Sequence, residues 1–330
     1  MKKLLSVMLI LMLSFGLVAC GGNNQEQPAA GNQQAAQEAP AAEKLVILYE
    51  QDDSMINNYS VLAVNPAAPF VDADGNAVSD VAVNTVGAKA LIDWLMSDAA
   101  KALIADYGVA DYGEYLFYLK DNAPVSTAEI PAATEDTKVI RLSTTTSVND
   151  SGLLTYLLPT FEQEYGYTVE VASAGTGKAI AAAKAGNADL ILVHSKSQEE
   201  AFVADGFASV LDGYEAERLT FMYNYFVLVG PESDPAGCKA APSVKDAFQL
   251  IADGKYTFVS RGDNSGTHTK ELSLWSADLG ITKDAESVKD YSWYVYSNAG
   301  MGTCLTMAGE QGGYILSDKA TFLTYQANQK

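Results

Sequence analysis

Apolar and polar positions follow two patterns along the chain after residue 137. Short runs of mainly apolar, β-branched or aromatic residues predict buried strands at 169–171, 189–193 and 226–229. Apolar residues spaced three and four apart predict helices at 153–164, 178–184 and 197–203. Strands that alternate with helices are typical of a parallel or mixed sheet covered by helices. This part of the chain is therefore predicted to have an α/β fold.

Two more blocks flank this region. Gly230-Pro231 ends the last strand, and the predicted elements after it are a helix at 244–252, a strand at 256–260, helices at 270–279 and 301–311, and a closing segment at 314–325. The block near the start of the chain has predicted strands at 45–49 and 61–64, a turn at 72–76 and a helix at 87–107. The polar, proline-containing stretch 121–137 is predicted to be a linker.

The first twenty residues have the pattern of a secretory signal peptide. Two lysines precede an apolar run, and the sequence Leu17-Val18-Ala19-Cys20 matches a bacterial lipoprotein cleavage box. We therefore expect a signal peptide over 1–20, a lipid on Cys20 and a disordered tether over 21–43, where no large apolar residue is present. These expectations place the protein outside the cytoplasm, attached to the cell membrane through its lipid only.

The charge of the chain limits the partners that it can have. The formal net charge is −20, which argues against binding to nucleic acid or direct adhesion to anionic lipid. The same charge repels small anions, so a bound anion would need focused donors in a closed cleft.

Few residues are available for metal binding or nucleophilic catalysis. The chain has two histidines, and no cysteine pair has the spacing of metal ligands, so we expect neither a metal ion nor a cofactor. An enzyme that hydrolyses phosphoesters would need a metal cluster or an activated nucleophile, and neither pattern is present. We therefore expect a protein that is not an enzyme. Cys238 and Cys304 fit either a disulfide in an exported protein or two separate buried thiols.

One loop concentrates hydrogen-bond donors. Residues 260–268 read SRGDNSGTH and lead into a predicted helix, so they place a guanidinium, hydroxyls and glycines before a helix start. Arg261 is one of only three arginines in the chain. Its planar fork can give two parallel charge-assisted hydrogen bonds to an oxyanion.

Two upstream loops have the same character. Residues 143–147 read STTTS and residues 174–178 read AGTGK, and each loop follows a predicted strand and precedes a predicted helix. Ser and Thr before a helix are usually simple N-caps, so one such loop would indicate little. Three of them together with a rare arginine predict an oxyanion site at the carboxyl ends of several strands.

These loops carry a resemblance to a known family. The segments STTTSVNDSG (143–152), AGTGK (174–178), ADLILVH (188–194), MYNYFVLVGP (222–231) and SRGDNSGTHTKELSLW (260–275) resemble the tungstate-binding proteins of bacterial ABC importers. The resemblance implies a two-lobed type II periplasmic-binding-protein fold, each lobe a mixed sheet flanked by helices. It also implies that a membrane permease and its ATPase are the partners.

The order of the segments differs from that of the family. YSVLAVNP (59–66), ALIDWL (90–95) and GEYLF (113–117) resemble its C-terminal portion but come first here, which suggests a circular permutation. Residues 44–60 would then complete lobe II, 61–120 and 138–226 would form lobe I, 227–330 would form the main part of lobe II, and 121–137 would join the ancestral ends. We expect a monomer, with a domain-swapped dimer as the competing assembly.

The resemblance implies capture of tungstate between the lobes. The ligand-binding residues that it implies are Thr145, Thr146, Ser147, Gly175, Thr176, Arg261, Ser265, Gly266 and Thr267. Molybdate and phosphate are the alternatives. A protonated phosphate needs an acceptor, which Asp263 could supply, whereas in a tungstate site Asp263 would orient Arg261.

Overall fold

A computed structural model describes residues 43–50 and 52–328, which belong to one unit of the chain, Pro40–Lys330. The expected signal peptide, Cys20 and nearly all of the expected tether lie outside these residues. Among the helices that are described, none has the length and apolar character needed to span a bilayer.

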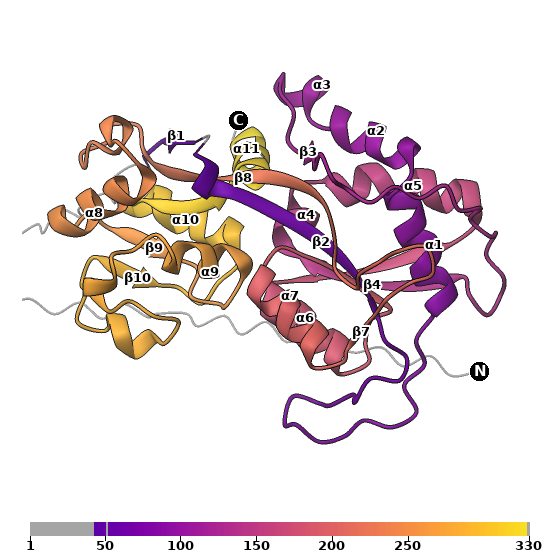
Figure 1. Cartoon of the computed structure of the whole chain (residues 1–330). Helices are drawn as coiled ribbons and strands as arrows, with labels where there is room; N and C mark the ends of the chain where they lie inside the picture. The colour runs from indigo at the N-terminus through magenta and orange to yellow at the C-terminus, as the bar shows by residue number, and fades with distance from the viewer. Residues whose placement is uncertain (1–42, 51, 329–330) are drawn as a thin grey trace, which may run out of the picture. The chain divides into compact units, whose positions relative to one another are not determined.

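A long antiparallel strand pair runs through the protein (Figure 1). Strands β2 (Ile56–Val64) and β8 (Leu219–Pro231) pair from Ile56↔Tyr225 to Val61↔Leu219. Beyond this pairing, β2 continues as the neighbour of β6, and β8 continues as the neighbour of β1 and β11. Each long strand thus contributes to two different regions of the sheet.

Lobe I is built on the region around β2. The order β2-β6-β4-β5 joins β2 to β6 (Leu190–Val193) in antiparallel fashion and then to β4 (Val139–Thr145) and β5 (Thr168–Ala174) in parallel fashion. All four residues of β6 are buried, because helices cover both faces of this region. The remaining elements of lobe I are β3 (Tyr118–Leu119), β7 (Ala208–Ser209), α1 (Thr85–Leu95), α2 (Asp98–Asp106), α3 (Val109–Tyr112), α4 (Thr146–Asp150), α5 (Leu153–Tyr165), α6 (Thr176–Lys184) and α7 (Lys196–Ala204).

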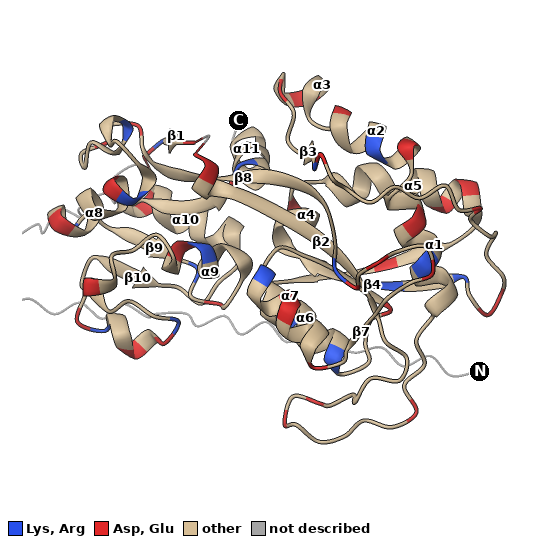
Figure 2. Ribbon diagram, in the orientation of Figure 1, with Lys and Arg blue, Asp and Glu red and all other residues tan. Residues whose placement is uncertain are grey.

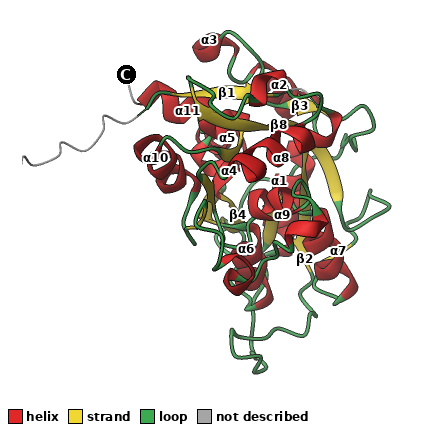
Figure 3. Ribbon diagram, turned by 90° about the vertical axis from the view of Figure 1, so that its left-hand side faces the viewer, coloured by secondary structure: helices red, strands yellow, loops and turns green. Residues whose placement is uncertain are grey.

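Lobe II is built on the other half of β8. Strands β1 (Leu45–Tyr49) and β11 (Ile315–Asp318) pair with it in antiparallel fashion, and β9 (Phe258–Ser260) pairs with β10 (Tyr294–Tyr296) in parallel fashion. Separate apolar clusters fill the two sides of this lobe. Its helices are α8 (Val244–Gly254), α9 (Gly266–Leu272), α10 (Met301–Gln311) and α11 (Lys319–Asn328), with short 3-10 turns at Asp53–Met55, Cys238–Ala240, Ala277–Leu279 and Ala285–Val288. In the view along the molecule, α10 and α11 lie on one side of the strands and α7 lies on the other (Figure 3).

The predicted α/β fold is confirmed, with differences at several boundaries. The single helix predicted at 87–107 is two helices, because the Ser97 side chain accepts a hydrogen bond from Ala100 N and starts α2 there. The strand predicted at 61–64 begins earlier, at Ile56. The prediction missed this first half because its polar residues interrupt the apolar pattern, although the strand is mostly buried there. The stretch predicted as a helix at 270–279 is α-helical only to Leu272 and contains a separate 3-10 turn at Ala277–Leu279.

The predicted linker 121–137 contains no helix or strand, yet it packs against lobe I. Ser126 donates from its hydroxyl to Asp93 Oδ1 over 3.0 Å, and Ala133 N donates to Tyr165 O over 2.8 Å. Ile130 and Ala133 add apolar contacts with the lobe I core. The stretch is therefore a packed connection between β3 and β4.

Candidate anion-binding site

Two of the three donor loops lie side by side because their strands are neighbours. β4 and β5 are parallel, with Thr145 opposite Ala174 at their carboxyl ends. The chain then enters α4 at Thr146 and α6 at Thr176, so both loops open at the same edge of the sheet. The N-terminus of α6 adds free backbone N–H groups and the positive end of its dipole at this edge.

The third loop approaches from lobe II and carries Arg261. The loop turns at Gly262, where φ is +61° and a methyl group would lie 2.7 Å from the Tyr296 ring, so only glycine fits. Arg261 is buried, and its Nη2 donates to Asp263 Oδ2 over 2.5 Å. Its Nη1 donates to Thr146 Oγ1 over 3.2 Å, which joins the two lobes.

Asp263 holds Arg261 in place. While Oδ2 accepts from Arg261, Oδ1 accepts from Ser265 N over 3.1 Å. The Ser265 hydroxyl in turn accepts from His268 N and caps α9. Both carboxylate oxygens therefore have donors within the loop, and this matches the orienting role expected of Asp263 in a tungstate site.

Three buried donor groups at this place have no partner within the described protein. They are Thr176 Oγ1 from α6, Thr267 Oγ1 from α9 and Arg261 Nε. Their side chains are at most 3% exposed, so water does not readily replace the missing acceptors. A buried polar group without a partner costs roughly 1–3 kcal/mol, and more when it is charged. A small anion with several acceptor oxygens would satisfy all three groups.

The other predicted site residues fall into two groups. The hydroxyls of Thr145 and Ser147 lie 3.0 Å apart and bond to each other, while Ser265 caps its own helix. Gly175 and Gly266 let the lobes approach. A methyl group on Gly175 would lie 3.2 Å from Asp263 Oδ2, and one on Gly266 would lie 2.6 Å from the His194 ring. All nine predicted residues thus belong to the region where the loops meet, but their ligand contacts remain a prediction.

Sequence reasoning missed a buried network behind the site. Asn57 donates through Nδ2 to Tyr59 OH and to Asn224 Oδ1, so its Oδ1 faces His194 and accepts from Nδ1 over 2.7 Å. The second ring nitrogen of His194 then accepts from Ser147 Oγ over 3.3 Å. Burial, followed by the charge of Arg261, lowers the pKa of His194 to about 3, so its imidazole is neutral.

Weak signals of this network were present in the sequence. His194 ends the segment ADLILVH that carries part of the resemblance, and Asn57 and Asn224 are polar residues beside apolar strand patterns. Strand register places Asn57 opposite Asn224, and no spacing rule in one sequence gives that pairing.

The two body cysteines are free thiols and form no disulfide. Cys238 packs in the apolar cluster of α8, where its thiol donates to Ala247 O over 3.7 Å. Cys304 packs in a different cluster, with Ser297 Oγ at 3.1 Å. The disulfide alternative is therefore wrong, because the strands of lobe II separate the two clusters, and the reading as separate buried thiols holds.

A mixed sheet flanked by helices, with loops at the carboxyl ends of its strands, defines the class of this fold, and comparisons with known proteins give its superfamily. The model of the PBP superfamily domain matches residues 131–330, and the chain therefore belongs to this superfamily. The tungstate-binding protein TupA of Peptoclostridium acidaminophilum is 45% identical over 57% of this chain, and TupA of Campylobacter jejuni subsp. jejuni is 37% identical over 56%.

These matches cover part of each relative. The chain spans 62% and 63% of the lengths of the two TupA proteins. A crystal structure described as the tungstate ABC transporter from Geobacter sulfurreducens is 41% identical, with 58% of this chain and 77% of that chain covered and a TM-score of 0.49.

The close approach of Gly266 to His194 predicts that a side chain at position 266 would disturb the packing of the two lobes. Gly266→Ala places a methyl group against the buried ring, and overpacking of this kind costs about 1–3 kcal/mol. We expect anion affinity to fall about 5-fold to 150-fold, because the clash arises only when the two lobes lie together as they do in this structure. Isothermal titration calorimetry measures the loss. Gly302→Ala is the matched control, since nothing lies within 4 Å of a methyl group there. Equal anion affinities of Gly266→Ala and Gly302→Ala would contradict this steric effect.

A buried carboxyl behind the Arg261 loop predicts a pH effect on stability. Glu271 accepts from Ser260 Oγ, Trp275 Nε1 and Tyr294 OH, yet burial raises its pKa from 4.5 to about 7. The folded protein thus keeps this proton up to about pH 7, whereas the unfolded chain releases it near pH 4.5. Its contribution to the free energy of unfolding therefore falls as pH rises through this window, by on the order of 3 kcal/mol.

Glu271→Gln removes the titrating group and keeps the shape of the side chain. We expect denaturant unfolding between pH 4.5 and pH 7 to show a stability loss in the parent protein that is smaller in this variant. Parallel stability curves for the two proteins would rule out the assigned role. Glu286→Gln controls for a change of charge at an exposed, salt-bridged carboxylate.

Proposed function

We propose that this protein is the extracytoplasmic substrate-binding component of an ABC importer and that it captures tungstate between its two lobes. The observation that carries the proposal is that Thr176, Thr267 and Arg261 belong to loops that meet between the lobes, and that each has a buried donor without a partner within the described protein. The donors come from both lobes, so an anion between them would hold the closed form together. The printed names of the two TupA relatives support tungstate as the anion.

The hydrogen-bonding pattern favours an anion without a proton. Both oxygens of Asp263 already accept hydrogen bonds, from Arg261 and from Ser265 N. Phosphate at neutral pH keeps a proton and needs an acceptor, whereas tungstate and molybdate need donors only. The geometry therefore supports tungstate or molybdate over phosphate, and Asp263 serves to orient Arg261.

Closure would bring the two halves of the site together. When the lobes separate, the hydrogen bond from Arg261 to Thr146 and the contact of Gly266 with His194 are lost. An anion that bonds to donors of both lobes binds the closed form better and so shifts the equilibrium toward it. The closed form would then deliver the anion to a permease driven by a separate ATPase.

We further propose that the chain is circularly permuted. The C-terminal helix α11 lies beside the first strand, since Gln326 Nε2 donates to Leu45 O over 3.0 Å, and Glu43 N donates to Gly309 O over 2.9 Å. A chain could therefore run from α11 directly into β1. The family model matches only 131–330, yet β2 from the earlier part supplies a central strand of the sheet.

The remaining expectations complete the proposal. A lipid on Cys20, the signal peptide and the tether would attach the protein to the outer side of the cell membrane, and we propose that it acts as a monomer. Residues 44–60 would complete lobe II, 61–120 and 138–226 would form lobe I, and 227–330 would form the rest of lobe II.

Arg261→Ala tests the assigned anion site. We expect tungstate affinity to fall by about 2 kcal/mol or more, roughly 30-fold, because the variant removes charge-assisted donors. Titration calorimetry with tungstate, molybdate, phosphate and sulfate measures affinity and selectivity. Lys239→Ala, which removes one exposed positive charge, should change none of these values. Tighter binding of phosphate than of tungstate would reassign the protein, and undiminished tungstate binding by Arg261→Ala would remove Arg261 from the site.

A rearranged chain tests the permutation. Residues 330 and 44 are joined by a short Gly/Ser linker, and new ends are opened within 121–137. We expect this chain to fold as a monomer and to bind tungstate within about threefold of the parent, because the contacts of the lobes are kept. Sedimentation and calorimetry check both points. A rearranged chain that is unfolded, while the parent is a stable monomer, would refute the permutation.

A further inference from the structure

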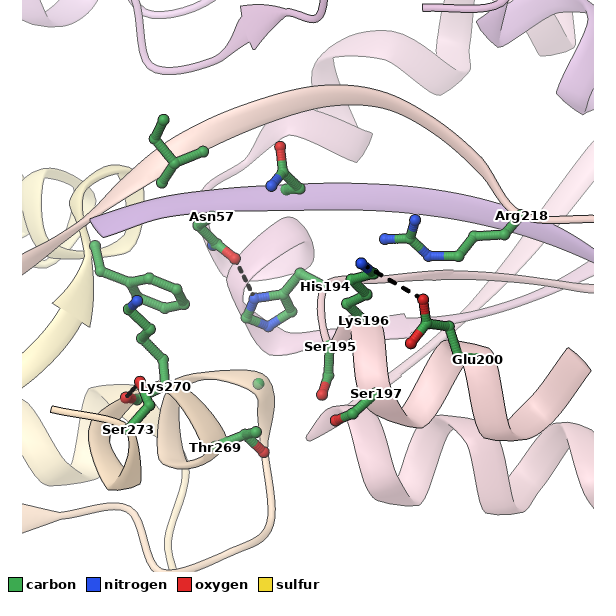
Figure 4. A pocket seen from close by; sticks show the side chains of 14 residues that line it. Asn57, His194, Ser195, Lys196, Ser197, Glu200, Arg218, Thr269, Lys270 and Ser273 are labelled. Carbon is green, nitrogen blue, oxygen red and sulfur yellow. Dashed lines mark hydrogen bonds and ion pairs between the residues drawn. The ribbon is translucent and has the colours of Figure 1, made fainter. Parts of the chain in front are cut away.

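A pocket with charged side chains in its lining lies next to the candidate anion site (Figure 4). Its volume is about 420 Å³, and it lies between α7 of lobe I and α9 of lobe II, below the crossing strands β2 and β8. His194 and Gly266 belong to its wall. His194 also contacts Ser147 of the candidate anion site, so this residue connects the pocket wall with that site.

Positively charged side chains dominate the lining of this pocket. Lys196, Arg218 and Lys270 face it, against the single carboxylate of Glu200. Hydroxyls from both lobes, including those of Thr269 and Ser197, add neutral donors. Figure 2 shows that both α7 and α9 carry a basic position next to acidic ones, in a protein whose net charge is −20.

The three cations differ in how far their charge is compensated. Lys196 Nζ lies 3.6 Å from Glu200 Oε1, and Arg218 Nε donates to the buried Glu199 Oε2 over 2.5 Å. The two terminal nitrogens of Arg218 make no hydrogen bond to the described protein. Lys270 makes no ion pair among the described side chains. Among the three cations of the pocket, Lys270 is thus the one without an ion-pair partner among the described side chains.

Partial burial gives Lys270 a reason to attract an anion. Burial lowers the pKa of Lys270, the charge of Asp52 partly opposes this effect, and the like charge of Lys245 adds to it. An ammonium group that has lost part of its water gains more from an anion than an exposed lysine does. A cleft with one sign of charge also raises the local concentration of the opposite ion.

We propose that the basic side chains of this pocket, with Lys270 at their centre, form an outer oxyanion-binding position on the facing edges of the two lobes, which attracts the incoming tetrahedral anion before the lobes close over the inner site. The proposal rests on the proposed function, because the anion is the same. The role of this outer position would be to speed the association of the anion with the protein. Lys270 and the free face of Arg218 would draw a hydrated anion toward the His194 and Gly266 wall, which opens when the lobes separate.

Lys270→Gln tests the outer position in the full-length protein. Stopped-flow mixing with tungstate, followed by tryptophan fluorescence because Trp275 lies close behind α9, gives the association and dissociation rates. We expect the association rate constant to fall at least fivefold at low salt, with a dissociation rate unchanged within a factor of two. The dependence of association on ionic strength should also become weaker.

Two further variants separate this effect from a general change of charge. Lys239→Gln removes an exposed lysine of the same lobe that does not line the pocket, and it should keep the parent rates. Lys270→Glu reverses the charge and should slow association further than Lys270→Gln does. Circular dichroism spectra that match the parent spectrum establish that each variant is folded.

The outcomes distinguish the two proposals. If the parent binds tungstate and Lys270→Gln associates at the parent rate, the outer position is refuted while the inner site stands. An increase confined to the dissociation rate would place Lys270 in the closed complex and would equally overturn the outer position. If the parent does not bind tungstate, the proposed function itself fails.

Discussion

The antiparallel pairing of β2 with β8 is the constraint on which the rest of the structure depends. Both strands contribute to more than one region of the sheet, so their register decides where the strand ends of lobe I can meet the Arg261 loop of lobe II. Asn57 and Asn224 sit opposite each other in this register and bond through their amides. The hydrogen bond between Asn57 and His194 connects this strand pair to the candidate site, because His194 also contacts Ser147.

The sequence was sufficient to locate the three donor loops, and the reason is physical. Each loop follows an apolar strand and precedes a helix, so local patterning marks the places where donors gather. Gly175 and Gly266 each lie close to a residue of the other lobe. These contacts could not be predicted, because they depend on how the lobes pack. The same limit applies to Asn57, since a polar residue in a buried strand is visible only when its partner across the sheet is known.

Helix boundaries and cysteines show the same difference between what local sequence predicts and what only the folded structure gives. Ser97 is an ordinary N-cap residue, yet the apolar periodicity on both sides of it predicted one continuous helix where the structure has two. Cysteine count and export leave the disulfide open, and only the packing of Cys238 and Cys304 in different clusters decides against it. Local chemistry therefore predicts where elements and donors occur, while pairings between distant residues need the folded structure.

The charge arrangement explains how such an acidic protein could hold a dianion. At the inner site the charge of Arg261 is balanced by Asp263, and the remaining donors are neutral hydroxyl and backbone groups. Binding there would depend on hydrogen-bond geometry in a dry space, which discriminates between protonated and unprotonated anions. A site whose charges are balanced in this way attracts an anion only weakly from a distance. Lys270 at the outer pocket would supply the long-range attraction that the balanced inner pair cannot, so selectivity and capture would rest on different residues.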